Sequence, residues 1–496
     1  IFIEKFITEP RHIEIQILAD KHGNTIYLGE RECSVQRRNQ KVIEEAPSPF
    51  LDESTRKKMG EQAVRLAENV GYSSAGTVEF IVDKNKNFYF LEMNTRLQVE
   101  HPVTELITGI DLVEQMICIA YGERLKITQD EIVLNGSAIE SRIYAENPYK
   151  NFLPSIGRLT KYYPPQEKTH DDGSITRNDT GVREGDEVSM FYDPMIAKLC
   201  SWGKTREASI KRMESSLDHF LLEGIDHNIP FLSSILGSKR FKSGDLTTSF
   251  IEDEYPNGFQ GSTLDKNEEW ILSTLFMAYY LSEASKDCSI DDDFSEEWEV
   301  KINNKNMGSE IGNFNFKIKK SLTSENEIYL KPIILKGLPG MVNDYIKVVL
   351  QKNYITKLVT AEIKLFDKNI TKISIPELIK CRINNNVPNL ELSYRGVSLS
   401  ALILPKHVAY YHKHMKPITI IDKSNLLLCP MPGKLIKVLV KEDDYIEEGQ
   451  ALCVVEAMKM ENTLFAEKKC MINKINFREG DTVSVDQTIM EFVFEK

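Results

Sequence analysis

Residues 90–101 read Phe-Leu-Glu-Met-Asn-Thr-Arg-Leu-Gln-Val-Glu-His. Side chains alternate between the two faces of a β-strand, so Glu92 and Asn94 share one face. If the chain stays extended, the same face continues with Arg96, Gln98 and Glu100. A series of acid, amide and guanidinium groups is chemically more varied than a solvated strand surface requires. The stretch therefore indicates a binding site.

A second strand pattern, Gly76-Thr77-Val78-Glu79-Phe80, precedes this stretch. The short loop Asp83–Asn87 predicts a hairpin that places Glu79 opposite Glu92, with their Cβ atoms about 5 Å apart. Two carboxylates this close repel each other unless a cation neutralises them, and Mg²⁺ prefers such oxygen ligands. The alternative is a solvated acidic face. It is disfavoured because the opposite face is apolar, with Val78, Phe80, Leu91 and Met93.

Length and charge narrow the class of protein. At about 150 residues per domain, 496 residues predict two to four domains. The 62 basic against 74 acidic residues give a net charge of −12, which argues against non-specific nucleic-acid binding. No apolar run approaches the roughly 20 residues of a membrane helix. The chain opens on Ile1-Phe2-Ile3-Glu4 without Met, so we expect it to begin inside a domain.

Composition divides the chain into four predicted segments. Residues 1–130 alternate strand and helix patterns, and residues 131–260 continue as α+β. Residues 261–425 contain one helical stretch, Asn267–Ser285, and then many short β patterns, which predicts an antiparallel β unit around or beside a helix. Residues 426–496 form a compact β module.

Local signals also predict individual elements in the first half. The stretch Asp52–Val70 predicts a helix with Asp52 as its N-cap and Gly71 as its stop. The stretches Arg11–Leu18 and Thr25–Leu28 predict paired strands.

The C-terminal module contains an internal repeat. Residues 437–452 match residues 474–489 after a shift of 37 positions. The matched pairs are Lys437 with Lys474, Val438 with Ile475, Glu442 with Glu479, Asp444 with Asp481, Ile446 with Val483, Gln450 with Gln487 and Leu452 with Ile489. Two copies of one β unit predict a quasi-two-fold flattened barrel in which each half supplies strands that the other needs.

Between the two copies lies the stretch Glu456-Ala457-Met458-Lys459-Met460-Glu461. In a two-fold β module this link is a hairpin tip, so Lys459 is expected to be an exposed amine on a tight turn. A solvated lysine beside two core methionines is the alternative. The repeat and the upstream Pro430-Met431-Pro432-Gly433 favour a modified lysine. Residues 426–496 resemble the biotinyl carrier domain of biotin-dependent carboxylases, which implies covalent biotin on Lys459. The rival, a lipoyl carrier, is disfavoured by methionine on both sides of the lysine.

Residues 1–250 resemble the ATP-grasp core of biotin carboxylase from the same family. The matching segments are residues 4–6, 10–16, 30–38, 44–47 and 92–102. The resemblance implies an α+β multidomain protein: a truncated ATP-grasp core, a helix-plus-antiparallel-β docking domain and a flattened β-barrel carrier. It implies ATP, biotin, and Mg²⁺ or Mn²⁺ as cofactors.

The resemblance also implies roles for individual residues. The residues expected to contact the nucleotide are Glu4, His12, Gln36 and Asn39. Those expected to bind the metal ion are Glu79, Glu92 and Asn94. Glu100 would be the base that deprotonates bicarbonate, Arg96 would orient bicarbonate, and Arg142 would stabilise the biotin enolate. Phe152 would line the biotin pocket.

The resemblance extends to partners and location. It implies a carboxyltransferase β subunit, which would carboxylate an acyl-CoA in an α/β hetero-oligomer, and a biotin protein ligase. It also implies the mitochondrial matrix. Asn39, where many relatives have His, and Tyr255–Phe259 favour one acyl-CoA branch over the 3-methylcrotonyl-CoA and acetyl-CoA enzymes. The middle region resembles the domain that docks the transfer subunit.

Three alternatives and one further expectation remain. The chain could belong to another acyl-CoA carboxylase, to a different ATP-grasp ligase with an unrelated carrier, or to a non-catalytic biotin carrier subunit. The family has an N-terminal α/β domain and a lid with a glycine-rich loop, and neither pattern is found in these residues. We therefore expect the chain to be an N-terminally truncated fragment that is inactive by itself.

Overall fold

The computed structural model describes residues 3, 5–189, 191–287, 297–305, 308–318, 327–332, 346–353, 358–365, 373–374, 379–386, 389–412, 414–415, 425–457 and 460–494. The chain separates into two compact units. The first comprises Ile1–Phe259 and Leu427–Lys496, and the second comprises Gln260–Leu426. None of the helices in the described ranges combines the length and the apolar character that a membrane span requires.

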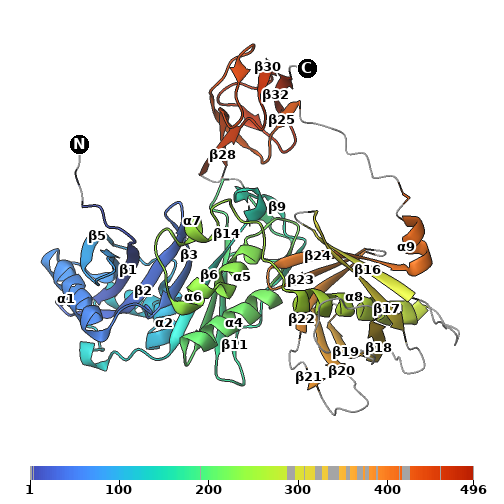
Figure 1. Ribbon diagram of the computed structural model, residues 1–496. Helices are drawn as coiled ribbons and strands as arrows, with labels where there is room; N and C mark the ends of the chain where they lie inside the picture. The colour runs from blue at the N-terminus through green and yellow to red at the C-terminus, as the bar shows by residue number, and fades with distance from the viewer. Residues whose placement is uncertain are drawn as a thin grey trace. The chain divides into compact units, whose positions relative to one another are not determined.

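A nine-stranded antiparallel sheet dominates the first unit (Figure 1). Its order is β11-β12-β14-β6-β3-β2-β1-β4-β5. The strands are β1 (Arg11–Ala19), β2 (Thr25–Arg37), β3 (Gln40–Ala46), β4 (Ser74–Val82), β5 (Phe88–Asn94), β6 (Ser137–Tyr144), β11 (Lys168–Thr169), β12 (Ile175–Thr180) and β14 (Met195–Gly203). Strands β1 to β3, which are consecutive in sequence, lie at the centre and bring their polar side chains together.

Helices cover this sheet, and short elements complete the region. The helices are α1 (Glu53–Asn69), α2 (His101–Thr108), α3 (Leu112–Ala120), α4 (Arg206–His219), α5 (Ile229–Gly237), α6 (Lys239–Ser243) and α7 (Phe250–Glu254). The short elements are η1 (Gln129–Glu131), η2 (Pro148–Lys150), β7 (Glu146–Asn147), β8 (Leu153–Pro154), β9 (Gly157–Arg158), β10 (Lys161–Tyr163), β13 (Glu187–Val188) and β15 (Leu221–Glu223).

The central strand β1 separates an apolar face from a polar one. Its alternate residues Ile13, Ile15 and Ile17 are fully buried in one cluster with Met59, Ala63 and Ala67 of α1. Because strand side chains alternate, Glu14 and Gln16 project to the opposite face, where they are also fully buried. Buried polar side chains need partners, so this face must hold a hydrogen-bonded network.

Several local predictions for this unit are confirmed. Helix α1 begins at Glu53, and its N-cap Asp52 accepts a hydrogen bond from the Thr55 amide at 2.9 Å. Strands β4 and β5 form the expected hairpin, and the predicted pairing of β1 with β2 is present. Strand β2 is longer than expected and continues to Arg37.

The stretch 90–101 differs from the sequence expectation in two respects. The extended chain ends at Asn94 and α2 begins at His101, so the condition for strand alternation to reach Arg96 is not met. The apolar face also differs, because the register of β4 and β5 shifts between Glu79 and Phe80. A bulge inserts an unpaired residue and reverses the side chains beyond it, which leaves Leu91 50% exposed.

The second unit confirms the expected helix with antiparallel strands. Helix α8 (Lys266–Asp287) packs on a nine-stranded sheet of order β19-β18-β17-β16-β24-β23-β22-β20-β21, and β19 also pairs with β20. The strands are β16 (Glu297–Asn304), β17 (Glu310–Ile318), β18 (Glu327–Pro332), β19 (Ile346–Asn353), β20 (Leu358–Leu365), β21 (Ile373–Ser374), β22 (Ile379–Asn386), β23 (Asn389–Tyr394) and β24 (Val397–Pro405). Helix α9 (Lys406–His412) follows the last strand.

The C-terminal module contains two four-stranded sheets, β25-β32-β30-β27 and β29-β28-β26-β31. The strands are β25 (Leu426–Leu428), β26 (Gly433–Val438), β27 (Tyr445–Ile446), β28 (Ala451–Ala457), β29 (Met460–Phe465), β30 (Cys470–Ile475), β31 (Thr482–Val483) and β32 (Thr488–Val493). Strand β31 of the second copy pairs with β26 of the first, and β27 of the first pairs with β30 of the second. The predicted exchange of strands is confirmed, and the expected flattened barrel takes the form of two facing sheets around one core.

Candidate functional site

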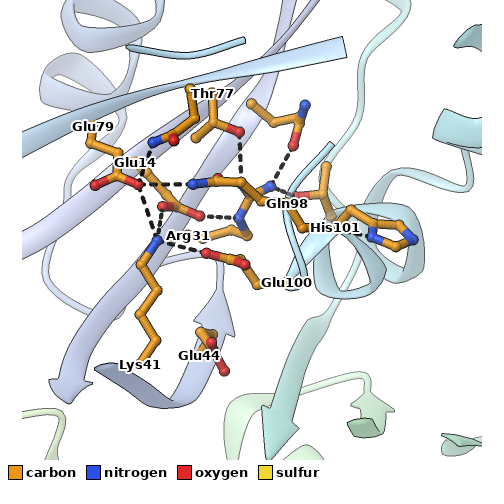
Figure 2. Close-up of polar contacts among 12 residues, drawn as sticks. Glu14, Arg31, Lys41, Glu44, Thr77, Glu79, Gln98, Glu100 and His101 are labelled. Carbon is orange, nitrogen blue, oxygen red and sulfur yellow. Dashed lines mark hydrogen bonds and ion pairs between the residues drawn. The ribbon is translucent and has the colours of Figure 1, made fainter. Parts of the chain in front are cut away.

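A lysine surrounded by carboxylates forms the centre of the polar face of the first sheet (Figure 2). The Nζ atom of Lys41, on β3, lies 2.5 Å from Glu14 Oε2, 2.6 Å from Glu100 Oε1 and 3.2 Å from Glu79 Oε1. Burial alone would lower the pKa of Lys41, but these carboxylates, Glu14 foremost, raise it. Lys41 is therefore a fixed positive charge that joins three strands to the start of α2.

Glu79 is the most heavily bonded of these carboxylates. Its Oε1 accepts from Gln98 Nε2 at 2.8 Å and from Asn94 Nδ2 at 3.0 Å, and its Oε2 lies 2.7 Å from His12 Nε2. Burial tends to raise the pKa of Glu79, but the contacts with His12 and Lys41 outweigh it and lower the pKa to about 2. Glu79 is thus an anion at neutral pH.

The expected metal ligands are adjacent. Glu79 and Glu92 are directly opposed in the register of β4 and β5, as predicted, and Asn94 Nδ2 also lies 3.1 Å from Glu92 Oε1. Glu92 is exposed, so this edge is open to solvent. Two carboxylates and an amide are a donor set that suits Mg²⁺ or Mn²⁺. A second group, with ligand atoms of His12, Glu14 and Glu79 within 4.8 Å of one another, includes a histidine and is buried. The oxygen-rich, open set suits a hard cation such as Mg²⁺ better.

Glu100 and Arg142 meet on the other side of Lys41. Arg142, on β6, donates through Nη2 to Glu100 Oε2 at 3.1 Å and through Nε to Glu44 Oε1 at 2.6 Å. Burial raises the pKa of Glu44 to about 7, although Arg142 opposes the shift. Glu100 therefore holds one cation on each carboxylate oxygen, because Lys41 occupies Oε1.

Arg96 is not brought into this cluster. Its side chain is exposed and donates to the backbone carbonyl of Leu97 at 3.3 Å. The physical reason is the end of β5 at Asn94, after which the chain no longer follows strand geometry. Arg96 is expected on the strand face of Glu92 only if the chain stays extended, and this condition is not met.

The remaining predicted residues lie as follows. Gln36 is 9% exposed and is paired in register with Lys41. Asn39 is exposed in the turn between β2 and β3, with φ 63°, and Arg38 has φ 49°. Two successive positive φ values are typical of a two-residue hairpin turn, which favours Asn, so the turn conformation by itself accounts for Asn39. Glu4 and Lys459 lie outside the described residues.

Phe152 is buried against other aromatic rings. Its ring centroid is 4.7 Å from that of Phe231, and the guanidinium of Arg37 lies 3.9 Å from its centroid. The residue has φ 60°, which is unusual for a bulky side chain. Only 8% of Phe152 is exposed.

The sequence assigned no role to Glu14, Arg31, Lys41 or Glu44. Arg31, Lys41 and Glu44 lie in or beside the matched segments 30–38 and 44–47, and Glu14 lies in the matched segment 10–16. Alternation along β1 could have found Glu14, because it interrupts the run Ile13, Ile15 and Ile17. The others become partners only through pairing between strands.

Known families match most of this chain in three segments. Residues 1–128 match "Carbamoyl-phosphate synthase L chain, ATP binding domain", and residues 140–253 match "Biotin carboxylase C-terminal domain". Residues 425–492 match "Biotin-requiring enzyme". This combination of domains, together with the carboxylate site, defines a biotin-dependent carboxylase.

Curated relatives narrow the family. The chain is 48% identical to the propionyl-CoA carboxylase alpha chain of Ruegeria pomeroyi, over 99% of this chain and 71% of the relative. It is 43% identical to the mitochondrial propionyl-CoA carboxylase alpha chain of Homo sapiens, over 99% of this chain and 64% of that one. The chain belongs to the family of propionyl-CoA carboxylase alpha chains. This confirms the branch that Asn39 favoured, since the rat methylcrotonoyl-CoA carboxylase alpha subunit is 38% identical.

The match is extensive but covers only part of the relatives. The chain spans 62% to 71% of the length of the curated propionyl-CoA carboxylase chains that it resembles. Among solved structures, Rhizobium etli pyruvate carboxylase matches with a TM-score of 0.50 at 35% identity, over 59% of this chain and 28% of that one.

Proposed function

We propose that the protein carboxylates carrier-bound biotin with bicarbonate at the expense of ATP. This would be the first half-reaction of propionyl-CoA carboxylation. The observation that carries the proposal is the Glu100 carboxylate, held between Lys41 and Arg142 and close to the acidic edge formed by Glu79 and Glu92. A base, two cations and a cation-binding edge are the groups that phosphoryl transfer from ATP to bicarbonate requires.

Glu79, Glu92 and Asn94 would hold the metal ion. When bound, Mg²⁺ or Mn²⁺ would neutralise charge between the β- and γ-phosphates of ATP. Asn94 now donates its amide nitrogen to both carboxylates, so its Oδ1 is turned away from them. We infer that rotation of this amide accompanies metal binding. His12, Gln36 and Asn39 would lie along the nucleotide, with Glu4 at the adenine.

Glu100 would take the proton of bicarbonate. Each of its carboxylate oxygens keeps a lone pair after accepting one hydrogen bond, so the held carboxylate can still accept a proton. The deprotonated oxygen then attacks the γ-phosphorus of ATP, the bond to the bridging oxygen breaks, and ADP leaves. Lys41 and Arg142 would stabilise the negative charge that develops. Arg96 would orient bicarbonate after turning away from the Leu97 carbonyl.

Biotin would be attached to Lys459 by a biotin protein ligase and would enter a pocket lined by Phe152. The exchange of strands in the two-fold module supports the carrier assignment, and so does the pairing of β28 with β29, which precede and follow Lys459 in the chain. We further propose a carboxyltransferase β subunit as the partner, docked on residues 261–425. The named α-chain relatives support this, and the mitochondrial ones support the matrix as the location. The four domains would be residues 1–130, 131–260, 261–425 and 426–496.

Two assays test the proposal on the full-length protein. The Glu100→Gln variant should lose bicarbonate-dependent release of ADP by about a hundredfold or more, the range for removing a catalytic base. Glu61→Gln, on the exposed face of α1, is the matched control and should retain full activity. Undiminished activity in Glu100→Gln would exclude the proposed base.

The carrier assignment has its own test. Streptavidin should detect the wild-type protein and the control Lys434→Arg, but not Lys459→Arg. Loss of overall carboxylation with Lys459→Arg separates this family from an ATP-grasp ligase with an unrelated carrier. Detection of the Lys459→Arg protein would exclude the assignment.

A further inference from the structure

Arg31, on β2, has no exposed surface, yet all five N–H donors of its guanidinium are used (Figure 2). Its Nε donates to Glu14 Oε1 at 2.5 Å. The other four bonds run to Gln16 Oε1 at 2.6 Å, Thr104 Oγ1 at 3.0 Å, Thr77 Oγ1 at 3.1 Å and Gln98 Oε1 at 2.9 Å. A lysine at this position has three donors on one nitrogen and cannot reproduce this planar fork.

One branch of the network runs through Glu14 to the base. Arg31 holds Oε1 of Glu14, so Oε2 is the oxygen that accepts from Lys41 Nζ, at 2.5 Å. Lys41 in turn donates to Glu100 Oε1 at 2.6 Å. The orientation of the Glu14 carboxylate, which Arg31 fixes, therefore sets where the Lys41 ammonium lies relative to Glu100.

The second branch runs through Gln98 to the metal edge. Because Gln98 Oε1 accepts from Arg31, its amide nitrogen is turned to Glu79 Oε1 at 2.8 Å. In the flipped amide, the NH₂ group would face the guanidinium and the carbonyl oxygen would face the Glu79 carboxylate. Both contacts would be repulsive, so Arg31 determines which end of Gln98 meets the site.

We propose that Arg31 is a positioning residue for the carboxylation reaction. One buried guanidinium sets both the Lys41 ammonium beside Glu100 and the Gln98 donor beside Glu79. Its hydrogen bonds among the described residues include neither Glu79 nor Glu100, so the hydrogen-bonded routes from Arg31 to these two carboxylates run through Glu14 and Gln98. The inference rests on the proposed function, which supplies the reaction that these groups serve.

The first test compares Arg31→Lys with Thr104→Val in the full-length protein. Thr104 accepts from the same guanidinium and lies one turn after Glu100 on α2, but its side chain belongs to neither branch. Its loss removes one hydrogen bond of Arg31 and keeps Glu14, Lys41 and Gln98 in place. We expect Arg31→Lys to lower kcat for bicarbonate-dependent ADP release at least tenfold, with KM for ATP within about twofold. Thr104→Val should keep kcat within about twofold. Equal kcat values for the two variants, measured per folded molecule, would overturn the proposal.

A double variant and a substitution that keeps Arg31 sharpen the test. In the Gln98→Ala background, Arg31→Lys should lower kcat by a smaller factor than it does in the wild type, because one of its two routes to the site is already gone. If the two single-variant losses of kcat multiply fully in the double variant, this expectation is contradicted. Gln98→Glu should be less active than Gln98→Ala, because Arg31 would hold one oxygen of the new carboxylate and point the other at Glu79. If the new carboxylate were free to turn away from Glu79, the two variants would be equal, and the proposed control by Arg31 would be wrong.

The outcomes also separate this inference from the proposed function. A wild-type protein without bicarbonate-dependent ADP release would count against the proposed function. A crystal structure of the Arg31→Lys variant needs no activity: displacement of Lys41 Nζ from Glu100, or reorientation of the Gln98 amide, is the expected result. Unchanged positions of both groups would overturn the positioning role by itself.

Discussion

The ammonium of Lys41 donates to Glu100 at 2.6 Å and connects that carboxylate to two others from different strands. This contact links the start of α2 to β3 and places a fixed cation beside the proposed base. It also makes the site and the stability of the sheet depend on the same side chain.

Replacing Lys41 by Met should therefore reduce both the catalytic activity and the free energy of unfolding. Loss of the ammonium leaves three carboxylates without their shared cation, and breaking a buried ion pair costs about 3–5 kcal/mol. We expect bicarbonate-dependent ADP release to fall at least a hundredfold and the free energy of unfolding to fall by a similar few kcal/mol in urea titrations. Lys57→Met is the control, because Lys57 is 71% exposed and lies 4.0 Å from Glu61. Indistinguishable stability of the two variants would contradict the role of Lys41.

Glu92→Gln should raise the Mg²⁺ concentration needed for half-maximal activity about tenfold or more, because it removes the charge of a proposed ligand at an exposed position. Saturating Mg²⁺ should restore much of kcat. Glu68→Gln, near the end of α1, is the control. Titration of ADP release with MgCl₂ at fixed ATP measures the effect. An unchanged Mg²⁺ requirement would exclude Glu92 as a ligand.

Glu14 should make the free energy of unfolding depend on pH in the acidic range. Burial raises its pKa, but the charges of Arg31 and Lys41 outweigh this and lower it from 4.5 to about 2. A depressed folded pKa stabilises the protein above the unfolded pKa, and this stabilisation is lost as pH falls from about 5 towards 2. The advantage of the wild type over Glu14→Gln, on the order of 3 kcal/mol at pH 7, should shrink at pH 3 in urea titrations. A constant difference across this range would contradict the assignment.

From the two-fold symmetry of the C-terminal module we expect two matched losses of amide protection against hydrogen exchange. The Ile475 amide donates to Glu442 Oε1 at 2.9 Å, and the Val438 amide donates to Glu479 Oε1 at 3.0 Å. Glu442→Ala should speed hydrogen exchange at Ile475 only, and Glu479→Ala should do so at Val438 only, by about fivefold to tenfold for a bond of roughly 1 kcal/mol. Glu448→Ala, at an exposed site, is the control. Exchange that changes equally at both amides in either variant would show that the contacts are not reciprocal.

The repeat and the hairpin were predictable because their patterns are local. A shift of 37 residues relates the amino-acid types of the two copies and also their hydrogen bonds. The Lys441 amide donates to Asp444 at 2.7 Å, as the Arg478 amide does to Asp481 at 2.8 Å. Likewise, the short loop between β4 and β5 fixed Glu79 opposite Glu92. Loop length and side-chain alternation are properties of neighbouring residues.

The sequence alone thus determined the family, the carrier repeat and the acidic edge at Glu79 and Glu92. Tertiary structure decided the rest of the site, because the contacts among Glu14, Arg31 and Lys41 join side chains from three strands, and the alternation along any one strand does not give those partners. It also removed Arg96 from the strand face, since the chain leaves extended geometry at Asn94. The role of Arg31 also depends on its burial in the folded sheet. A buried guanidinium requires a partner for every donor, and the partners of Arg31 meet only when the sheet is assembled.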